Sequence, residues 1–168
     1  MPNTFELIAS STVGAGGASS IDFTSIPSTY TDLCLKVSVR INNTSTAFST
    51  IEFNGSASSF SSRWLDGSGS AVSSGTTPSN TAFASNWSGA TSNTFNNAEI
   101  YIPNYAGSNN KSYSSDSVTE NNATQAFADL IAGLWSNSAA INQVTLKPPS
   151  GTSFVQYSTA YLYGVKNA

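Results

Sequence analysis

The stretch YTDLCLKVSVRI, from Tyr30 to Ile41, decides the fold class that we assign to this chain. Every second residue in it is a large aliphatic side chain, namely Leu33, Leu35, Val37, Val39 and Ile41. The residues between them are mostly polar or charged, and they include Lys36 and Arg40. Because successive side chains of a strand point to opposite faces, the stretch predicts a strand with one apolar and one polar face. Such a strand is typical of an antiparallel sheet that packs on a core with one side only.

The same alternation recurs along most of the chain. It predicts strands within 4–10, 20–26, 48–56, 60–70, 98–105, 111–121, 141–148 and 154–165. Gly, Pro and Asn-Gly sequences separate these segments, and Asp66-Gly67 is predicted to form a turn. The segment AFADLIAGLW, 126–135, also has helix-like spacing, and we favour a strand over a helix there. Residues 66–97 are rich in Ser, Thr, Asn and Gly and are expected to be loops with two or three short strands.

The length and composition indicate one folded domain. With 168 residues and 39% hydrophobic side chains, the chain has enough apolar surface to form a core rather than remain disordered. About ten predicted strands with irregular connections favour a two-sheet antiparallel β-sandwich of the jelly-roll kind over residues 1–168. No repeat of constant period is visible, which argues against a propeller or a solenoid.

The sparse charge argues against several classes of protein. Charged residues make up 9% of the chain, the net charge is -3, and the few basic residues are scattered, so nucleic-acid binding is not expected. The longest apolar run, 126–135, is too short to cross a bilayer, and no membrane partner is expected. The N-terminal sequence MPNTFELIAS lacks the features of a signal peptide, and we expect no export by that route.

The chain offers little material for a catalytic or metal site. It contains no His, which removes the commonest general base and the usual catalytic triads. Its one cysteine, Cys34, is expected to be an unreactive, half-buried side chain. Five carboxylates on predicted strands remain as candidates for glycoside hydrolysis, which needs only two acids: Asp22, Asp32, Glu52, Glu99 and Glu120. Most of them alternate away from the apolar face, and we expect neither an enzyme nor a bound cofactor or metal.

The aromatic side chains are the strongest candidates for a contact surface. Tyr157, Tyr161 and Tyr163 are expected to share one face of the last strand, and Trp64 and Trp87 are candidates for a stacking platform. Such rings suit half-wet protein interfaces, and they also stack against sugars. Three interpretations stay open: the rings close the edge of the core, they contact another subunit, or they bind a glycan. Of the last two, we favour subunit contact.

Several short motifs resemble, in their order along the chain, those of a group of small proteins of tailed bacteriophages, including cyanophages. The matching residues are Phe23, Ile26, Pro27, Tyr30, Asp32, Leu33, Asn54-Gly55 and Tyr163-Gly164. The resemblance covers both ends of the chain and is thin in the middle. It implies a β-sandwich structural protein that decorates or cements the phage head, or that forms part of a tail or fibre. It brings no catalytic or ligand-binding residues.

On this basis we expect a virion protein that is assembled in the host bacterial cytoplasm. The leading hypothesis is a capsid decoration, or cement, protein that binds the outside of the head lattice and stabilises it. Its expected partners are the major capsid protein or other virion proteins, and a homotrimer is favoured. The alternative is a tail-fibre or receptor-binding module that recognises host surface carbohydrate. Neutral polar faces suit docking because hydroxyl and amide groups hydrogen-bond to a neighbour without the cost of burying ions.

Overall fold

The computed structural model describes residues 4–120, 122 and 126–166. In this part of the chain every regular secondary-structure element is a β-strand. The strands are β1 Phe5–Thr12, β2 Ile21–Phe23, β3 Asp32–Ser38, β4 Ala47–Phe53, β5 Phe60–Gly67, β6 Val72–Thr77, β7 Thr81–Ser85, β8 Asn97–Ile102, β9 Lys111–Val118, β10 Ala128–Trp135, β11 Val144–Lys147 and β12 Thr159–Val165. The described residues accordingly include no helix that could span a membrane.

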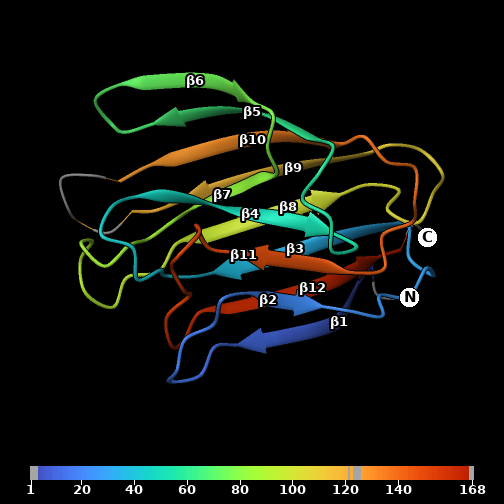
Figure 1. Ribbon diagram of the computed structural model, residues 1–168, viewed down its shortest axis with the longest axis horizontal. Coiled ribbons are helices and arrows are strands. Elements are labelled where there is room, and N and C mark those ends of the chain that lie inside the picture. Colours follow the sequence, from blue (N-terminus) through green and yellow to red (C-terminus); the bar gives the residue numbers. More distant parts are fainter. Residues whose placement is uncertain (1–3, 121, 123–125, 167–168) are drawn as a thin grey trace.

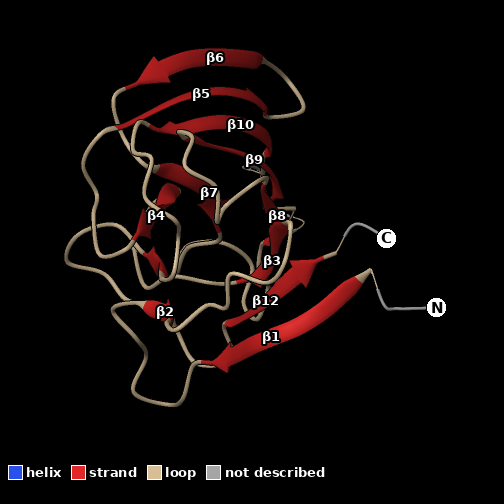
Figure 2. Cartoon of the chain, turned by 90° about the vertical axis from the view of Figure 1, so that its right-hand side faces the viewer, coloured by secondary structure: helices blue, strands red, loops and turns tan. Residues whose placement is uncertain are grey.

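The strands form two sheets in which every pair of neighbours is antiparallel. The larger sheet has eight strands in the order β1-β12-β3-β8-β9-β10-β5-β6, and the smaller has four in the order β2-β11-β4-β7. The two sheets lie face to face, and the larger sheet curves around the smaller one (Figure 1, Figure 2). The prediction of an all-β, two-sheet antiparallel β-sandwich is confirmed.

Strand β3 shows how the alternating sequence builds the core. Its side chains Leu33, Leu35 and Val37 are buried and belong to one apolar cluster with Ile51 and Leu146 of the smaller sheet. Burying side chains of this size contributes about 1.5–3 kcal/mol each relative to leaving them exposed. The apolar face predicted from the sequence is therefore the face that joins the two sheets.

The other face of β3 is less exposed than the sequence predicts at Cys34. This residue lies opposite Tyr101 of β8 on one side and Tyr163 of β12 on the other. It is fully buried rather than half-buried, and this burial raises the pKa of the thiol. Because the thiolate is the reactive form, the structure keeps Cys34 inert.

Strands β9, β10, β5 and β6 form one continuous end of the larger sheet, which we call the extension. It is attached to the smaller sheet by an aromatic cluster around Phe53 of β4. The ring of Phe53 lies 5.5 Å from Phe60, 5.5 Å from Trp135 and 6.1 Å from Tyr113, measured between centroids. Tyr113 lies across Gly133 of the neighbouring strand, where an added Cβ would be 1.9 Å from the ring. The extension is therefore packed on the core and is not a free flap.

Three sequence predictions concern the bounds of strands. Segment 126–135 is a strand from Ala128 to Trp135, as favoured, and its side chains alternate strictly between exposed and buried. The turn predicted at Asp66-Gly67 is wrong, because pairing with β10 carries β5 through to Gly67, and the chain turns over residues 68–71 instead. The prediction that Tyr157 shares a strand face with Tyr161 and Tyr163 is also wrong, since β12 begins only at Thr159 and Tyr157 has a φ of 71°.

Region 66–97 contains two short strands after the end of β5, namely β6 and β7, and a long loop. The guanidinium of Arg40 holds that loop. It donates five hydrogen bonds of 2.9–3.3 Å to four residues of the loop, Ser88, Ala90, Thr91 and Thr94. Backbone carbonyl oxygens accept four of these bonds. The planar guanidinium therefore fixes the conformation of a loop whose backbone is not held by strand pairing.

Candidate functional site

The outer face of the extension carries exposed aliphatic side chains. Five of them form a group that we call the extension patch: Leu65, Val72, Val118, Leu130 and Leu134. Leu130 of β10 is 58% exposed and Val72 of β6 is 75% exposed. Strict alternation in β10 places Leu130 and Leu134 on this face, while Ile131 and Trp135 enter the core. Because soluble proteins seldom expose contiguous aliphatic groups without a use, the extension patch is the main candidate for a contact surface.

Two open hollows flank Leu130 within the extension patch. One, of about 410 Å³, extends towards Arg63 and Ala132, and the other, of about 310 Å³, extends towards Val72 and Ala128. Both are lined by Leu65, Asp116 and Leu130. A ridge between two hollows can interlock with a partner surface of complementary shape, which is the property that protein interfaces require.

A second apolar group lies at the opposite edge of the same sheet, on β1 and β12. We call this group, which consists of Phe5, Leu7, Tyr161 and Tyr163, the edge patch. Leu7 lies opposite Tyr163 in the strand register, and Tyr161 lies opposite Ser10. Tyr161 and Tyr163 are thus brought together on one face as predicted, while Tyr157 is 68% exposed in the preceding turn.

The structure separates the two tryptophans proposed as a stacking platform. Trp87 is 6% exposed and belongs to the core cluster. Trp64 is half-buried, and its indole lies 6.4 Å from the ring of Phe48 on the smaller sheet. It also lies against Gly75 of β6, where an added Cβ would be 2.6 Å from the ring. Neither tryptophan offers a flat, exposed surface to a sugar, and Trp64 instead lines a pocket between the sheets.

That pocket has a volume of about 160 Å³ and contains two carboxylates, Asp66 of β5 and Asp129 of β10. The two residues lie directly opposite each other in the strand register. Asp129 is 4% exposed, and its Oδ2 accepts a hydrogen bond of 3.3 Å from the hydroxyl of Ser117. Burial raises the pKa of Asp129 to about 6, the charge of Asp66 adds to the rise, and the Ser117 hydrogen bond opposes it.

Local sequence patterns do not point to this pair of acids. Asp129 shares a strand face with Ile131 and Trp135, and an acid on such an apolar face is the signal that could have found it. Asp66 was hidden by its assignment to a turn. The five acids that were considered each have a separate hydrogen-bond or ion-pair partner in the structure: Asp22 with Thr145, Asp32 with Tyr101, Glu52 with Lys147, Glu99 with Lys36, and Glu120 with Asn122.

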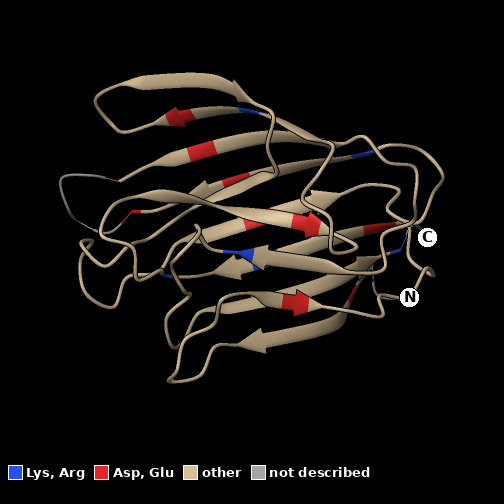
Figure 3. Cartoon of the chain, in the orientation of Figure 1, with Lys and Arg blue, Asp and Glu red and all other residues tan. Residues whose placement is uncertain are grey.

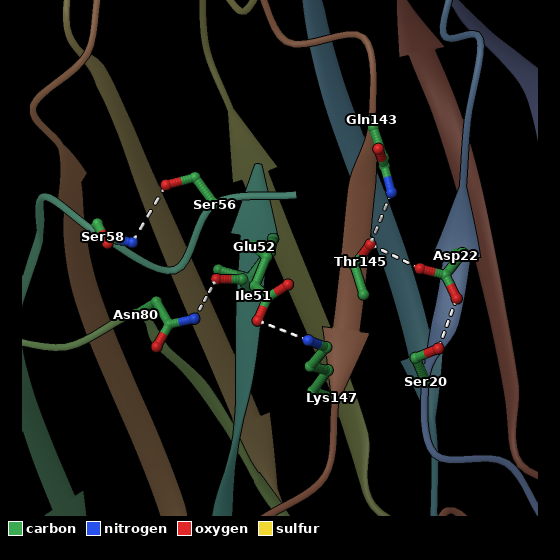
Figure 4. A network of polar contacts seen from close by, with 10 residues as sticks. All are labelled: Ser20, Asp22, Ile51, Glu52, Ser56, Ser58, Asn80, Gln143, Thr145 and Lys147. Atoms are coloured by element: carbon green, nitrogen blue, oxygen red, sulfur yellow. Dashed lines mark hydrogen bonds and ion pairs between the residues drawn. The ribbon is translucent and has the colours of Figure 1, made fainter. Parts of the chain in front are cut away.

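The outer face of the smaller sheet differs from the extension patch because it is polar (Figure 4). Asp22 accepts hydrogen bonds from Ser20 at 2.5 Å and from Thr145 at 2.7 Å. Lys147 and Glu52 form an ion pair of 2.9 Å on the neighbouring strands. The polar groups of this face therefore satisfy one another within the subunit, whereas the aliphatic groups of the extension patch have no such partners.

Comparison of the chain with protein-family models, with curated proteins and with solved structures gave no match. Among the residues that the structure describes, no group of three or more His, Cys, Asp or Glu side chains could hold a metal ion.

Proposed function

We propose that the chain is a structural subunit of a tailed-bacteriophage virion, a decoration or cement protein that docks on the outside of the head. The observation that carries this proposal is the extension patch. Single exposed aliphatic residues are ordinary on protein surfaces, but a group of them on one sheet face is a docking surface. Burying each one against a capsid protein would contribute about 1 kcal/mol or more, and repetition over many copies multiplies the effect.

The strand order supports the jelly-roll interpretation that accompanies this proposal. When the four strands of the extension are set aside, eight strands remain, in the orders β1-β12-β3-β8 and β2-β11-β4-β7. Each set interleaves strands from the two ends of the chain, as two nested Greek keys do. On this interpretation β5–β6 and β9–β10 are two pairs inserted into a jelly roll, and they carry the docking surface.

The edge patch supports an assembly of subunits, because it lies at the other edge of the sheet and stays free when the extension patch docks on the head. Exposed apolar side chains of this kind suit a contact between neighbouring copies. A trimer is the oligomer that we favour. Native mass spectrometry tests it: we expect trimers of the wild type and monomers of the variant Leu7→Asp. A wild-type chain that stays monomeric would refute the oligomer.

The decisive experiment is mass spectrometry and cryo-electron microscopy of purified phage particles, which should show the chain on the head. Particles without the chain, or with the chain confined to the tail, would overturn the proposal. A binding assay adds a residue-level test: the double variant Leu65→Asp/Leu130→Asp should lose at least about tenfold in binding to heads that lack the protein. The matched control is Thr12→Asp, on the same sheet but in β1 at its opposite edge, which should bind normally.

The alternative, a glycan-binding receptor module, loses both of its predicted tryptophan stacking residues. A sugar-stacking site needs an exposed aromatic face, but Trp87 is buried and Trp64 faces the inter-sheet pocket, so the exposed tyrosine rings that remain for it are Tyr157 and Tyr161. A glycan array with the purified protein distinguishes the two functions. Specific binding that is lost on Tyr161→Ala, an exposed ring of the edge patch, would favour the receptor function.

A further inference from the structure

The pocket between the sheets has an aromatic wall and an acidic wall. Its aromatic side chains are Phe48 of β4, Trp64 of β5 and Phe127, which comes just before β10. Its acids are Asp66 and Asp129 on the neighbouring strands β5 and β10. The one acidic segment of each of these strands is red in Figure 3, and the two lie side by side near one end of the sandwich.

The buried acid of this pocket is poorly satisfied by the protein. A carboxylate can accept about four hydrogen bonds, and within the described residues Asp129 accepts one, from the hydroxyl of Ser117. That hydroxyl also accepts a hydrogen bond of 3.1 Å from the backbone N–H of Ala84. A carboxylate that is 4% exposed, with an unpartnered oxygen and an empty space beside it, is suited to a positively charged ligand.

No basic side chain of the protein supplies that charge. Lys36, Lys147 and Lys166 form ion pairs elsewhere, Arg40 and Lys111 donate to carbonyl groups, and Arg63 lines the outer hollow. Apart from Asp66 and Asp129, the described residues that line the pocket are uncharged; β4 contributes Phe48 next to Thr46, and β7 contributes Ala84. Net negative charge is therefore concentrated in a half-enclosed space with aromatic walls.

We propose that this pocket binds an organic ammonium group, either a small quaternary ammonium ion or the ammonium end of a lysine side chain. The faces of aromatic rings attract cations through the ring quadrupole. Several aromatic rings placed beside an acidic side chain form a site that recognises ammonium groups. The cavity of about 160 Å³ is smaller than the roughly 300–1,000 Å³ of pockets for drug-sized ligands, so it accommodates a head group and not a large molecule. A calcium ion is a poorer fit, because it needs about six to eight oxygen ligands.

The aromatic wall is held in place by the fold. Gly75 of β6 has no side chain, so the indole of Trp64 can pack close against that strand. Phe48 lies 6.4 Å from Trp64 at a tilt of 37°, and the two rings belong to different sheets. The pocket thus depends on the packing of the extension against the smaller sheet, and the inference does not rest on the proposed role in a virion.

The test compares ligands that differ only in charge. The first pair is choline, which is charged, and 3,3-dimethylbutan-1-ol, which has the same shape and is neutral. The second pair represents a lysine side chain: N-acetyl-lysine methylamide is charged, and its norleucine analogue is neutral. Binding is followed by the NMR signal of the Trp64 indole N–H and by calorimetry. We expect saturable binding of choline or of the lysine analogue, at least tenfold tighter than binding of the matched neutral compound, and stronger at pH 7.5 than at pH 5 because Asp129 ionises in between.

Two single variants test whether the ammonium compounds bind beside Asp129. Asp129→Asn should weaken ammonium binding at least tenfold and remove its pH dependence, whereas Asp116→Asn, an exposed acid on the outer face of β9, should leave both unchanged. Equal binding of the charged and neutral compounds would overturn the proposal. So would unchanged binding by Asp129→Asn, binding of Ca²⁺ without binding of either ammonium compound, or no saturable binding of any probe. None of these outcomes bears on whether the chain is present in virions, so the two proposals are tested separately.

Discussion

The buried carboxylate of Asp129 should make the protein less stable as the pH rises from about 4 to about 7. The pKa of this group is about 6 in the folded protein, against an ordinary value of 3.8. The folded state therefore retains a proton that the unfolded state has already released, and folding stability falls as the pH rises through this interval. Below about pH 4 the group is protonated in both states and its effect disappears.

The size of the effect follows from the two pKa values. A difference of about two between them corresponds to about 3 kcal/mol of unfolding free energy. Asp129 faces a pocket that water can enter, which screens the charge, so we expect about 1–3 kcal/mol. Asp129→Asn removes the charge and keeps the shape, and an asparagine carbonyl can still accept the hydrogen bond from Ser117. The variant should therefore be more stable than the wild type by this amount at pH 7.5.

Urea denaturation at a series of pH values measures this difference. The stability of the variant relative to the wild type should grow between pH 4 and pH 7 and then stay constant. The comparison between the two proteins cancels the other titrating groups, such as Glu6, whose pKa is lowered by its hydrogen bond from Lys166. Asp116→Asn is the matched control and should follow the wild type. A stability difference that is independent of pH, or a variant that is less stable at pH 7.5, would refute the reasoning.

Two further substitutions test how the fold holds its parts together. Gly133→Ala places a methyl group within 1.9 Å of the Tyr113 ring and should lower the unfolding free energy by at least about 2 kcal/mol, while Gly67→Ala, which meets open space, should change it by less than about 0.5 kcal/mol. Arg40→Lys keeps the charge but loses the planar fork that binds residues 88–94. Hydrogen exchange of the amides of that loop should then be at least about tenfold faster, with exchange in β3 unchanged; equal rates in the loop would contradict the assigned role of Arg40.

The strands could be predicted from the sequence because alternation is a local property. Leu33, Leu35 and Val37 reveal a buried face without knowledge of any partner strand. The candidate site could not be predicted in the same way, because Asp66 and Asp129 meet only through the pairing of β5 with β10, far apart in the chain. The Asp66-Gly67 dipeptide favours a turn locally, and pairing along the whole length of β10 overrides that preference.

The extension contains most of the residues that depart from the usual rules of packing and hydrogen bonding. In the described residues, four buried side-chain polar atoms have no hydrogen-bond partner, and three of them belong to the extension: those of Ser62, Ser115 and Trp135. Asp129 adds a nearly unpaired buried acid, and the extension patch adds exposed aliphatic groups. The buried polar groups without partners lower the stability of the folded subunit, and the exposed aliphatic groups add little to it. Proteins depart from such rules chiefly where a site is used. The other eight strands form the interleaved sandwich, and the extension contributes the proposed docking surface and the two acids of the proposed ammonium pocket.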